Sequence, residues 1–116
     1  MANDAFIYDS IRTPRGKKKN GALNEITPAD LVSKLMIHLQ RKHNLDTSQV
    51  DDIIMGCVTP IGDQGANIGK IASQYAGWDT DVPEMQENRF CSSSLETFNL
   101  AGRILLLLAE WELQLL

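Results

Sequence analysis

Short apolar runs alternate along this chain with amphipathic segments of helical length, and this alternation limits the folds that it can adopt. Apolar runs predict strands at residues 5–8 and 52–58, and a further strand is expected near residues 84–90, in the connection that precedes Cys91. Helices are predicted over residues 27–43, late in the segment 59–77, and directly after Cys91. A chain with this order is expected to form an α/β layer, in which largely parallel strands are joined by right-handed crossover helices.

The composition predicts one folded domain. With 116 residues, of which 43% are hydrophobic, the chain is long enough for a single packed core. Its net charge of −4 argues against nucleic-acid binding, which usually requires a basic surface. The basic run Lys17-Lys18-Lys19 lies between glycine and asparagine, and it indicates a solvated loop rather than a phosphate contact.

The cysteine content and the apolar runs bear on the cellular compartment. Two cysteines, Cys57 and Cys91, are too few for a disulfide framework of the secreted kind. The first ten residues lack a charged stretch followed by an apolar one, and no apolar run approaches the roughly 18 residues of a membrane span. We therefore expect a cytoplasmic protein, or an organellar one after processing, with no membrane span.

The clearest helix is predicted over residues 27–43. Thr27 can cap its first turn, Pro28 suits its first position, and Asp30 has the spacing of a capping box. Apolar residues recur along one face at helical spacing: Leu31, Val32, Leu35, Met36 and Leu39. His38 and His43 lack the spacing of a metal site, so we expect them at the surface rather than as ligands.

Cys57 lies inside the apolar run at 52–58, whose composition is typical of a strand that is apolar on both faces. We expect it to be a small buried hydrophobic residue. The glycines that follow, Gly62, Gly65 and Gly69, match neither a dinucleotide-binding nor a P-loop pattern. They predict a flexible entry into a packed helix rather than a phosphate cradle.

Cys91 has a different setting, because it follows one predicted strand and precedes a predicted helix. Ser93 and Glu96 have the spacing of a capping box, which places the helix start within a residue or two of the thiol. The unpaired N–H groups and the positive dipole end of a helix both favour a thiolate, and Arg89 can add to this effect. The sequence indicates a nucleophile here, with a structural cysteine at a helix start as the alternative.

The segment around Cys91, NRFCSSSLETFNLA at 88–101, resembles the nucleophile segment of the thiolases, Asn-Arg-x-Cys-x-Ser-Gly-Leu. AFIYDSIRTPRGK resembles the opening strand and loop of the same family. TPADL, VDDIIMGCVTPIGDQGANIGKIA and AGW follow in the family's order and spacing. The resemblance covers residues 4–101, and several separate motifs agree in order.

The resemblance implies an acyltransferase in which Cys91 takes an acyl group as a thioester. Free CoA then completes the cleavage of a 3-ketoacyl-CoA, as in fatty-acid β-oxidation, or an acetyl-CoA carbanion condenses to acetoacetyl-CoA. It implies CoA thioesters as substrates, with no metal or redox cofactor. It also implies a layered αβαβα fold, of which residues 1–116 would be an incomplete N-terminal domain, in a homodimer or homotetramer.

The sequence departs from the family pattern in two ways. Ser94 stands where the family generally has glycine, and its side chain could crowd the site or be tolerated. The likeness fades after Ala101, which makes 102–116 a divergent tail and predicts truncation or a frameshift near Gly102. The family's Gly-His-Pro histidine, its Cys-x-Gly loop and its Asn-Glu segment do not occur in these 116 residues.

We therefore expect the chain on its own to be inactive, with an exposed apolar edge and apolar tail that favour association. One alternative is a non-catalytic thiolase-like fragment, or a dimerisation partner of a full-length thiolase. A second is a related condensing enzyme such as a ketoacyl synthase. The Asn88-Arg89 pair and the IRTPRGK loop favour the thiolases.

Overall fold

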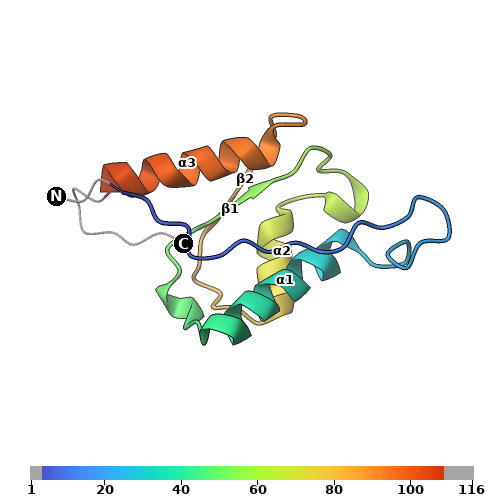
Figure 1. Ribbon diagram of the computed structural model, residues 1–116, viewed down its shortest axis with the longest axis horizontal. Coiled ribbons are helices and arrows are strands. Elements are labelled where there is room, and N and C mark those ends of the chain that lie inside the picture. The colour runs from blue at the N-terminus through green and yellow to red at the C-terminus, as the bar shows by residue number, and fades with distance from the viewer. Residues whose placement is uncertain (1–3, 109–116) are drawn as a thin grey trace.

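The computed structural model describes residues 4–108 and shows a small α/β arrangement around a parallel pair of strands (Figure 1). The elements are α1 (Pro28–His43), β1 (Ile53–Gly56), α2 (Ile68–Ala76), β2 (Glu84–Glu87) and α3 (Ser93–Leu108), with single 3₁₀ turns at Thr47–Gln49 and Gly62–Gln64. The register places Ile53 opposite Glu84 and Gly56 opposite Glu87. The predicted α/β class with parallel strands is confirmed.

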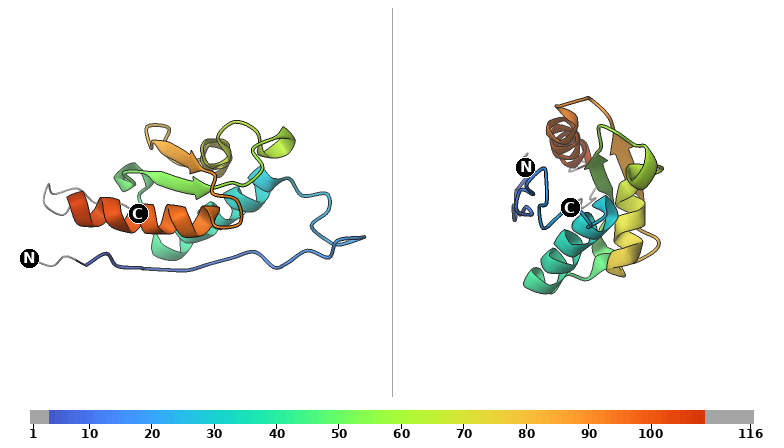
Figure 2. Two further views of the ribbon diagram at one scale, coloured as in Figure 1. Left: turned by 90° about the horizontal axis from the view of Figure 1, so that it is seen from above. Right: turned by 90° about the vertical axis from the view of Figure 1, so that its right-hand side faces the viewer.

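The helices cover both faces of the two strands. Helix α2 is the crossover between β1 and β2, and Gly69 on it lies against Met55 and Glu84. Gly56 faces the opposite way and lies against the start of α3, as the alternation of side chains along a strand requires. Helix α1 packs on α2, so the strands lie between α3 and the α1–α2 layer (Figure 2).

Helix α1 forms as the sequence predicts. The Thr27 hydroxyl accepts a hydrogen bond from the Asp30 N–H at 3.2 Å, and Pro28 opens the helix. Asn44 ends the helix in the left-handed conformation, which satisfies the last carbonyl groups. Met36 is buried against α2 and the strands, whereas Leu31 and Leu35 are only half-buried.

Two groups of buried side chains form the core. The larger consists of Met36, Val50, Ala72, Trp78 and Val82, with Ile53 and Met55 packed against it. The smaller consists of Ala29, Cys57 and Ile68. Cys57 is 5% exposed, which confirms that it is a buried hydrophobic residue.

The predicted strand at 5–8 is wrong. Residues 4–17 run past the sheet without helical or strand structure (Figure 1). Phe6, Ile7 and Tyr8 are 66%, 68% and 83% exposed. An apolar run becomes a strand only where it pairs with a neighbouring edge, and residues 5–8 pair with neither β1 nor β2. Because the sheet formed by the described residues has two strands, the residues of β1 are half-buried rather than buried on both faces as expected.

Strand β2 is shorter than predicted, and its polar side chains Glu84 and Gln86 face α2. It ends at Glu87, before the predicted boundary at residue 90, because Asn88 begins a turn. The Gln86 side chain accepts a hydrogen bond from the Ile68 N–H at 3.0 Å, and Ser73 donates one to Glu84. Burial raises the pKa of the Glu84 carboxyl group above its usual value.

The last residues of α3 form the first part of the predicted apolar tail. Leu106 and Leu107 are 41% and 69% exposed, so this part of the tail faces solvent as expected. The remainder of the divergent tail, 109–116, lies outside the described residues. Across residues 4–108, none of the helices combines the length and apolar character that a membrane span requires.

Candidate active site

Cys91 lies in a tight turn that joins β2 to α3, and its side chain is exposed. Asn88 fixes the start of the turn with two hydrogen bonds. Its side-chain amide donates to the Val58 carbonyl at 3.0 Å, which ties the turn to the end of β1. Its side-chain oxygen accepts from the Phe90 N–H at 3.0 Å, which closes an Asx turn immediately before Cys91.

The residue before the thiol has an unusual backbone conformation. Phe90 has φ of +50°, a region that non-glycine residues seldom occupy, and its side chain is 77% exposed. The turn continues with hydrogen bonds from the Ser92 N–H to the Arg89 carbonyl and from the Ser93 N–H to the Phe90 carbonyl, both 3.1 Å. This sharp reversal leaves Cys91 at the surface, directly ahead of the helix.

The predicted capping box of Ser93 and Glu96 is wrong, although the helix begins where that spacing places it. Ser93 is the first residue of α3, and its buried hydroxyl turns back into the elbow. It accepts from the Arg89 N–H at 2.9 Å and donates to the Phe90 carbonyl at 2.6 Å. Both partners of the Ser93 hydroxyl lie in the turn, so this hydroxyl stabilises the turn and does not cap the Glu96 N–H.

Gly56 allows α3 to begin close to the sheet. A Cβ atom at this position would lie 2.5 Å from the Ser94 nitrogen and 2.7 Å from the Ser93 carbonyl carbon. Any side chain would therefore push the helix start away from β1. Ser94 itself is exposed, so its backbone rather than its side chain makes the close contact with β1.

The first turn of α3, which follows Cys91 in the chain, contains backbone N–H groups without an intrahelical acceptor. Its first i to i−4 hydrogen bond runs from the Glu96 N–H to the Ser92 carbonyl at 2.9 Å. The N–H groups of Ser94 and Leu95 precede that bond, in the turn where helix amides lack an intrahelical acceptor. Amides in this position can donate to an oxygen that becomes negatively charged during attack by the Cys91 sulfur.

Arg89 is directed at the helix rather than left free beside the thiol. Its guanidinium group pairs with the Glu96 carboxylate, one turn into α3. The pair is exposed, so its contribution to stability is small. The ion pair of Arg89 and Glu96 therefore links the turn to the helix. The negative charge of Glu96 offsets the positive charge by which Arg89 was expected to favour a thiolate at Cys91.

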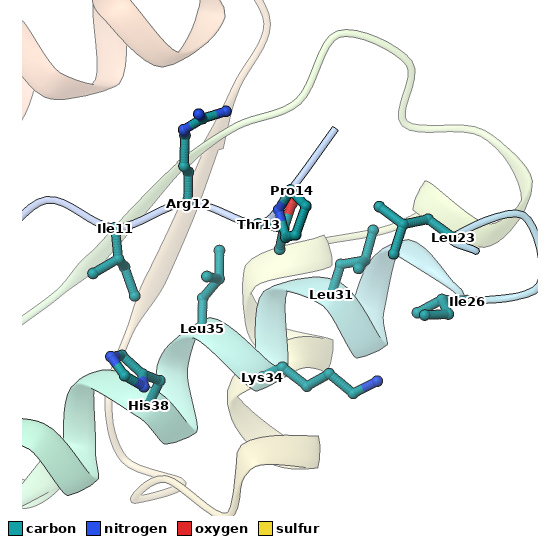
Figure 3. Close-up of a pocket in the computed structure, with 10 residues that line it drawn as sticks. All are labelled: Ile11, Arg12, Thr13, Pro14, Leu23, Ile26, Leu31, Lys34, Leu35 and His38. Atoms are coloured by element: carbon teal, nitrogen blue, oxygen red, sulfur yellow. The ribbon is translucent and has the colours of Figure 1, made fainter. Parts of the chain in front are cut away.

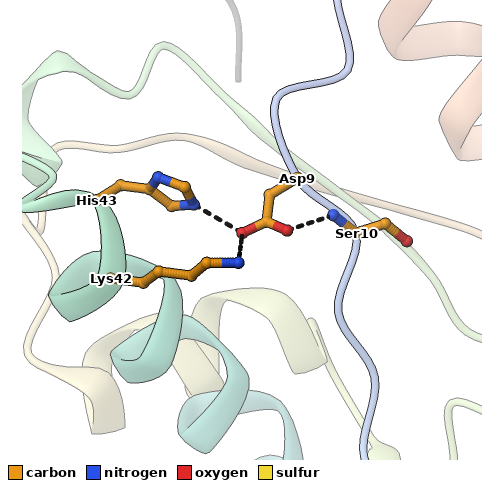
Figure 4. A network of polar contacts seen from close by, with 4 residues as sticks. All are labelled: Asp9, Ser10, Lys42 and His43. Carbon is orange, nitrogen blue, oxygen red and sulfur yellow. Dashed lines mark hydrogen bonds and ion pairs between the residues drawn. The ribbon is translucent and has the colours of Figure 1, made fainter.

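Both histidines lie on α1, away from this turn. His38 lines a groove between α1 and residues 11–14 (Figure 3). The His43 Nε2 lies 2.6 Å from the Asp9 carboxylate, which also accepts from the Lys42 ammonium at 2.8 Å (Figure 4). These hydrogen bonds hold the pKa of Asp9 well below its usual value. Both histidines are exposed, which confirms their predicted surface position.

Three features of the turn were not predicted from the sequence: the Asn88 bonds, the Phe90 conformation and the Gly56 contact. Two of them have a recognisable signal. Asparagine commonly closes turns of this kind, and a glycine within an apolar strand often marks a close approach of another backbone. Among residues 4–108, no three histidine, cysteine or acidic side chains gather in a way that could hold a metal ion.

Comparison with known proteins gives a consistent result. The family model described as "Thiolase, N-terminal domain" matches residues 5–106. The 3-ketoacyl-CoA thiolase of Serratia proteamaculans is 38% identical over 104 residues, which cover 89% of this chain and 27% of that protein. The 3-ketoacyl-CoA thiolase of Aeromonas salmonicida is 40% identical over 101 residues, covering 86% and 26%. The chain thus spans about a quarter of the length of these relatives.

Proposed function

Because this chain belongs to the thiolase family, we propose that Cys91 is its acyl-accepting nucleophile. The observation that chiefly supports this role is the position of the thiol, exposed in the turn ahead of a sixteen-residue helix. Cys57 is buried in the core and is not a competing candidate. The relatives carry the name 3-ketoacyl-CoA thiolase, and we assign this chain the same substrate class.

The proposed reaction has two steps. In the cleavage direction the Cys91 sulfur attacks the 3-keto carbon, the C2–C3 bond breaks, and acetyl-CoA leaves after its C2 takes a proton. The thiol of free CoA then attacks the acyl thioester on Cys91, and its proton returns to the Cys91 sulfur. Run in reverse from acetyl-CoA, the same steps condense two acetyl groups to acetoacetyl-CoA. The Ser94 and Leu95 N–H groups would stabilise the oxyanion of each addition.

The proposal concerns acyl transfer to Cys91 rather than turnover by this chain alone. Both histidines lie on α1, which packs on α2 and not on the Cys91 turn, so neither serves as a general base there. We expect steady-state thiolysis by the 116-residue chain to be absent or very slow. We propose CoA thioesters as the substrates, with no metal or redox cofactor, and a homodimer or homotetramer as the family-like assembly.

A second candidate function is a non-catalytic one, in which the chain associates with a full-length thiolase. The observation that favours it is the exposed apolar surface of α3, where Leu95 and Phe98 are 63% and 55% exposed. This alternative predicts binding to a thiolase without any acyl group on Cys91.

Intact-mass measurement after incubation with excess acetyl-CoA distinguishes the two functions. We expect the mass of one acetyl group to be added to the native chain and to Cys57→Ala, and no addition to Cys91→Ala. Peptide mapping should place the group on Cys91. An adduct that persists in Cys91→Ala, or a native chain that stays unmodified, would contradict the proposed nucleophile.

A further inference from the structure

The Asn88 side chain connects the ends of both strands to the residue that precedes the thiol. Asn88 directly follows β2, and its side-chain amide donates to the Val58 carbonyl at 3.0 Å, just beyond the end of β1. Its side-chain oxygen accepts from the Phe90 N–H at 3.0 Å. The proposed function assigns roles to Cys91 and to the helix amides but none to this side chain, which makes the most contacts in the turn ahead of the thiol.

The backbone conformation of Phe90 requires support from its neighbours. At its φ of +50° the side chain crowds the backbone, and such a conformation persists only where surrounding contacts hold it. The Phe90 side chain is 77% exposed, so packing of its ring within the described residues supplies little of this support. The support comes from hydrogen bonds to its backbone. Asn88 accepts from the Phe90 N–H, and the N–H and hydroxyl groups of Ser93 donate to the Phe90 carbonyl.

The conformation of Phe90 determines where Cys91 lies relative to the helix. A change of the Phe90 φ to the usual negative range would redirect the chain that follows it, beginning with Cys91. The start of α3 could not follow freely, because the backbone at Ser94 lies against Gly56, where an added Cβ would be 2.5 Å from the Ser94 nitrogen. A relaxed turn would therefore move the Cys91 sulfur relative to the amides of the first helical turn.

We infer that Asn88 is a positioning residue for acyl transfer, which fixes the Cys91 sulfur relative to the helix amides that follow it. The inference rests on the proposed function, in which these amides stabilise the oxyanion. Asn88 acts through its contacts with Phe90 and Val58 rather than on the substrate. Oxyanion donors must lie about 2.7–3.1 Å from the charged oxygen, so a small displacement of the sulfur is enough to weaken their effect.

Two reactions of Cys91 separate its positioning from the reactivity of the thiol itself. Acetyl transfer from acetyl-CoA develops an oxyanion, whereas alkylation by iodoacetamide displaces iodide and develops none. In a Cys57→Ala background, Asn88→Ala should lower the ratio of the acetyl-transfer rate to the alkylation rate by at least roughly fivefold, because two hydrogen bonds are lost. Asn99→Ala removes an exposed asparagine side chain from α3 and is the matched control, which should leave this ratio unchanged. Circular dichroism checks that each variant is folded.

Glycine at position 90 provides a rescue test. Glycine adopts a positive φ without steric cost, so this conformation no longer depends on the hydrogen bond from Asn88. Phe90→Gly added to Asn88→Ala should therefore transfer acetyl groups at least roughly threefold faster than Asn88→Ala alone. Glycine also increases the conformational freedom of the unfolded chain, so it would not restore a rate that Asn88→Ala had lowered only by destabilising the fold.

The outcomes distinguish this positioning role from the proposed function. If Cys57→Ala with native Asn88 transfers no acetyl group to Cys91, the proposed function and the role of Asn88 are both wrong. If that chain transfers acetyl groups and Asn88→Ala does so at the same rate, only the role of Asn88 is wrong. Equal losses in acetyl transfer and alkylation, or a loss that Phe90→Gly does not reverse, would show that Asn88 serves only the stability of the turn.

Discussion

Gly56 shows how one residue sets the geometry of the candidate site. It ends β1, and its missing side chain leaves room for the backbone at Ser93 and Ser94. That close approach brings the first turn of α3, and with it Cys91, against the end of the sheet. Ser94, the residue that differs from the family pattern, contributes its nitrogen to this contact while its side chain remains exposed.

Replacing Gly56 with alanine should therefore destabilise the chain. The added Cβ would meet backbone atoms that cannot move independently, and overpacking of this kind typically costs about 1–3 kcal/mol. Urea denaturation followed by circular dichroism measures the loss. Gly102→Ala is the matched control, because no atom lies within 4 Å of a Cβ there. Alanine at that helical position should raise stability slightly; an equal loss in both variants would contradict the Gly56 contact.

At the scale of elements, the packing of α2 on the strands includes a buried carboxyl group. Glu84 begins β2 and faces α2, where Ser73 donates to one carboxyl oxygen and the other is buried without a hydrogen-bond partner among the described residues. Burial raises the pKa of Glu84, with Ser73 and Lys70 opposing the effect and Asp52 adding to it. Burial also raises the pKa of Asp52, which precedes β1.

The sign of the resulting pH dependence follows from the raised pKa of Glu84. The folded state favours the protonated form of Glu84. The stability that this preference contributes is fully present below the pKa that Glu84 has in the unfolded chain, and it is lost as the pH rises through the pKa that Glu84 has in the folded chain. Glu84→Gln should therefore be more stable than the native chain at pH 8, with the difference shrinking toward pH 4. Thermal unfolding between pH 4 and pH 8 tests this difference in stability. Glu25→Gln, which changes an exposed carboxyl group, is the control. A variant that is less stable at pH 8 would contradict the assignment.

The helices could be predicted from the sequence because their signals are local. Thr27, Pro28 and the apolar spacing lie within a single turn or two of one another, and α1 begins and ends as they indicate. The strand predicted at 5–8 failed because pairing depends on an edge elsewhere in the fold. The role of Ser93 was also missed, since a hydroxyl at a helix start can bond forward to the helix or back to the preceding turn, and here it bonds back.

In the molecule as a whole, β1 and β2 lie between α3 and the α1–α2 layer (Figures 1 and 2). Cys91 lies in the turn between β2 and α3. Apart from the strand expected at 5–8, the order of strands and helices was predictable, because alternation with crossover helices permits few topologies. The exposed apolar residues near the start of α3 were not predicted, because an apolar helix face does not reveal what covers it. Leu95 and Phe98 remain exposed on that helix within the described residues.

We propose that the fold itself makes Cys91 reactive toward a thioester. The most direct measurement is the rate of acetyl transfer from acetyl-CoA to Cys91 in Cys57→Ala, folded in buffer and unfolded in urea at the same pH. If helix amides stabilise the oxyanion, the folded chain should react faster by at least roughly tenfold, since one such donor can be worth more than that. Equal rates, or a slower folded chain, would show that the turn holds a structural cysteine and would contradict the proposed role of Cys91 as a nucleophile.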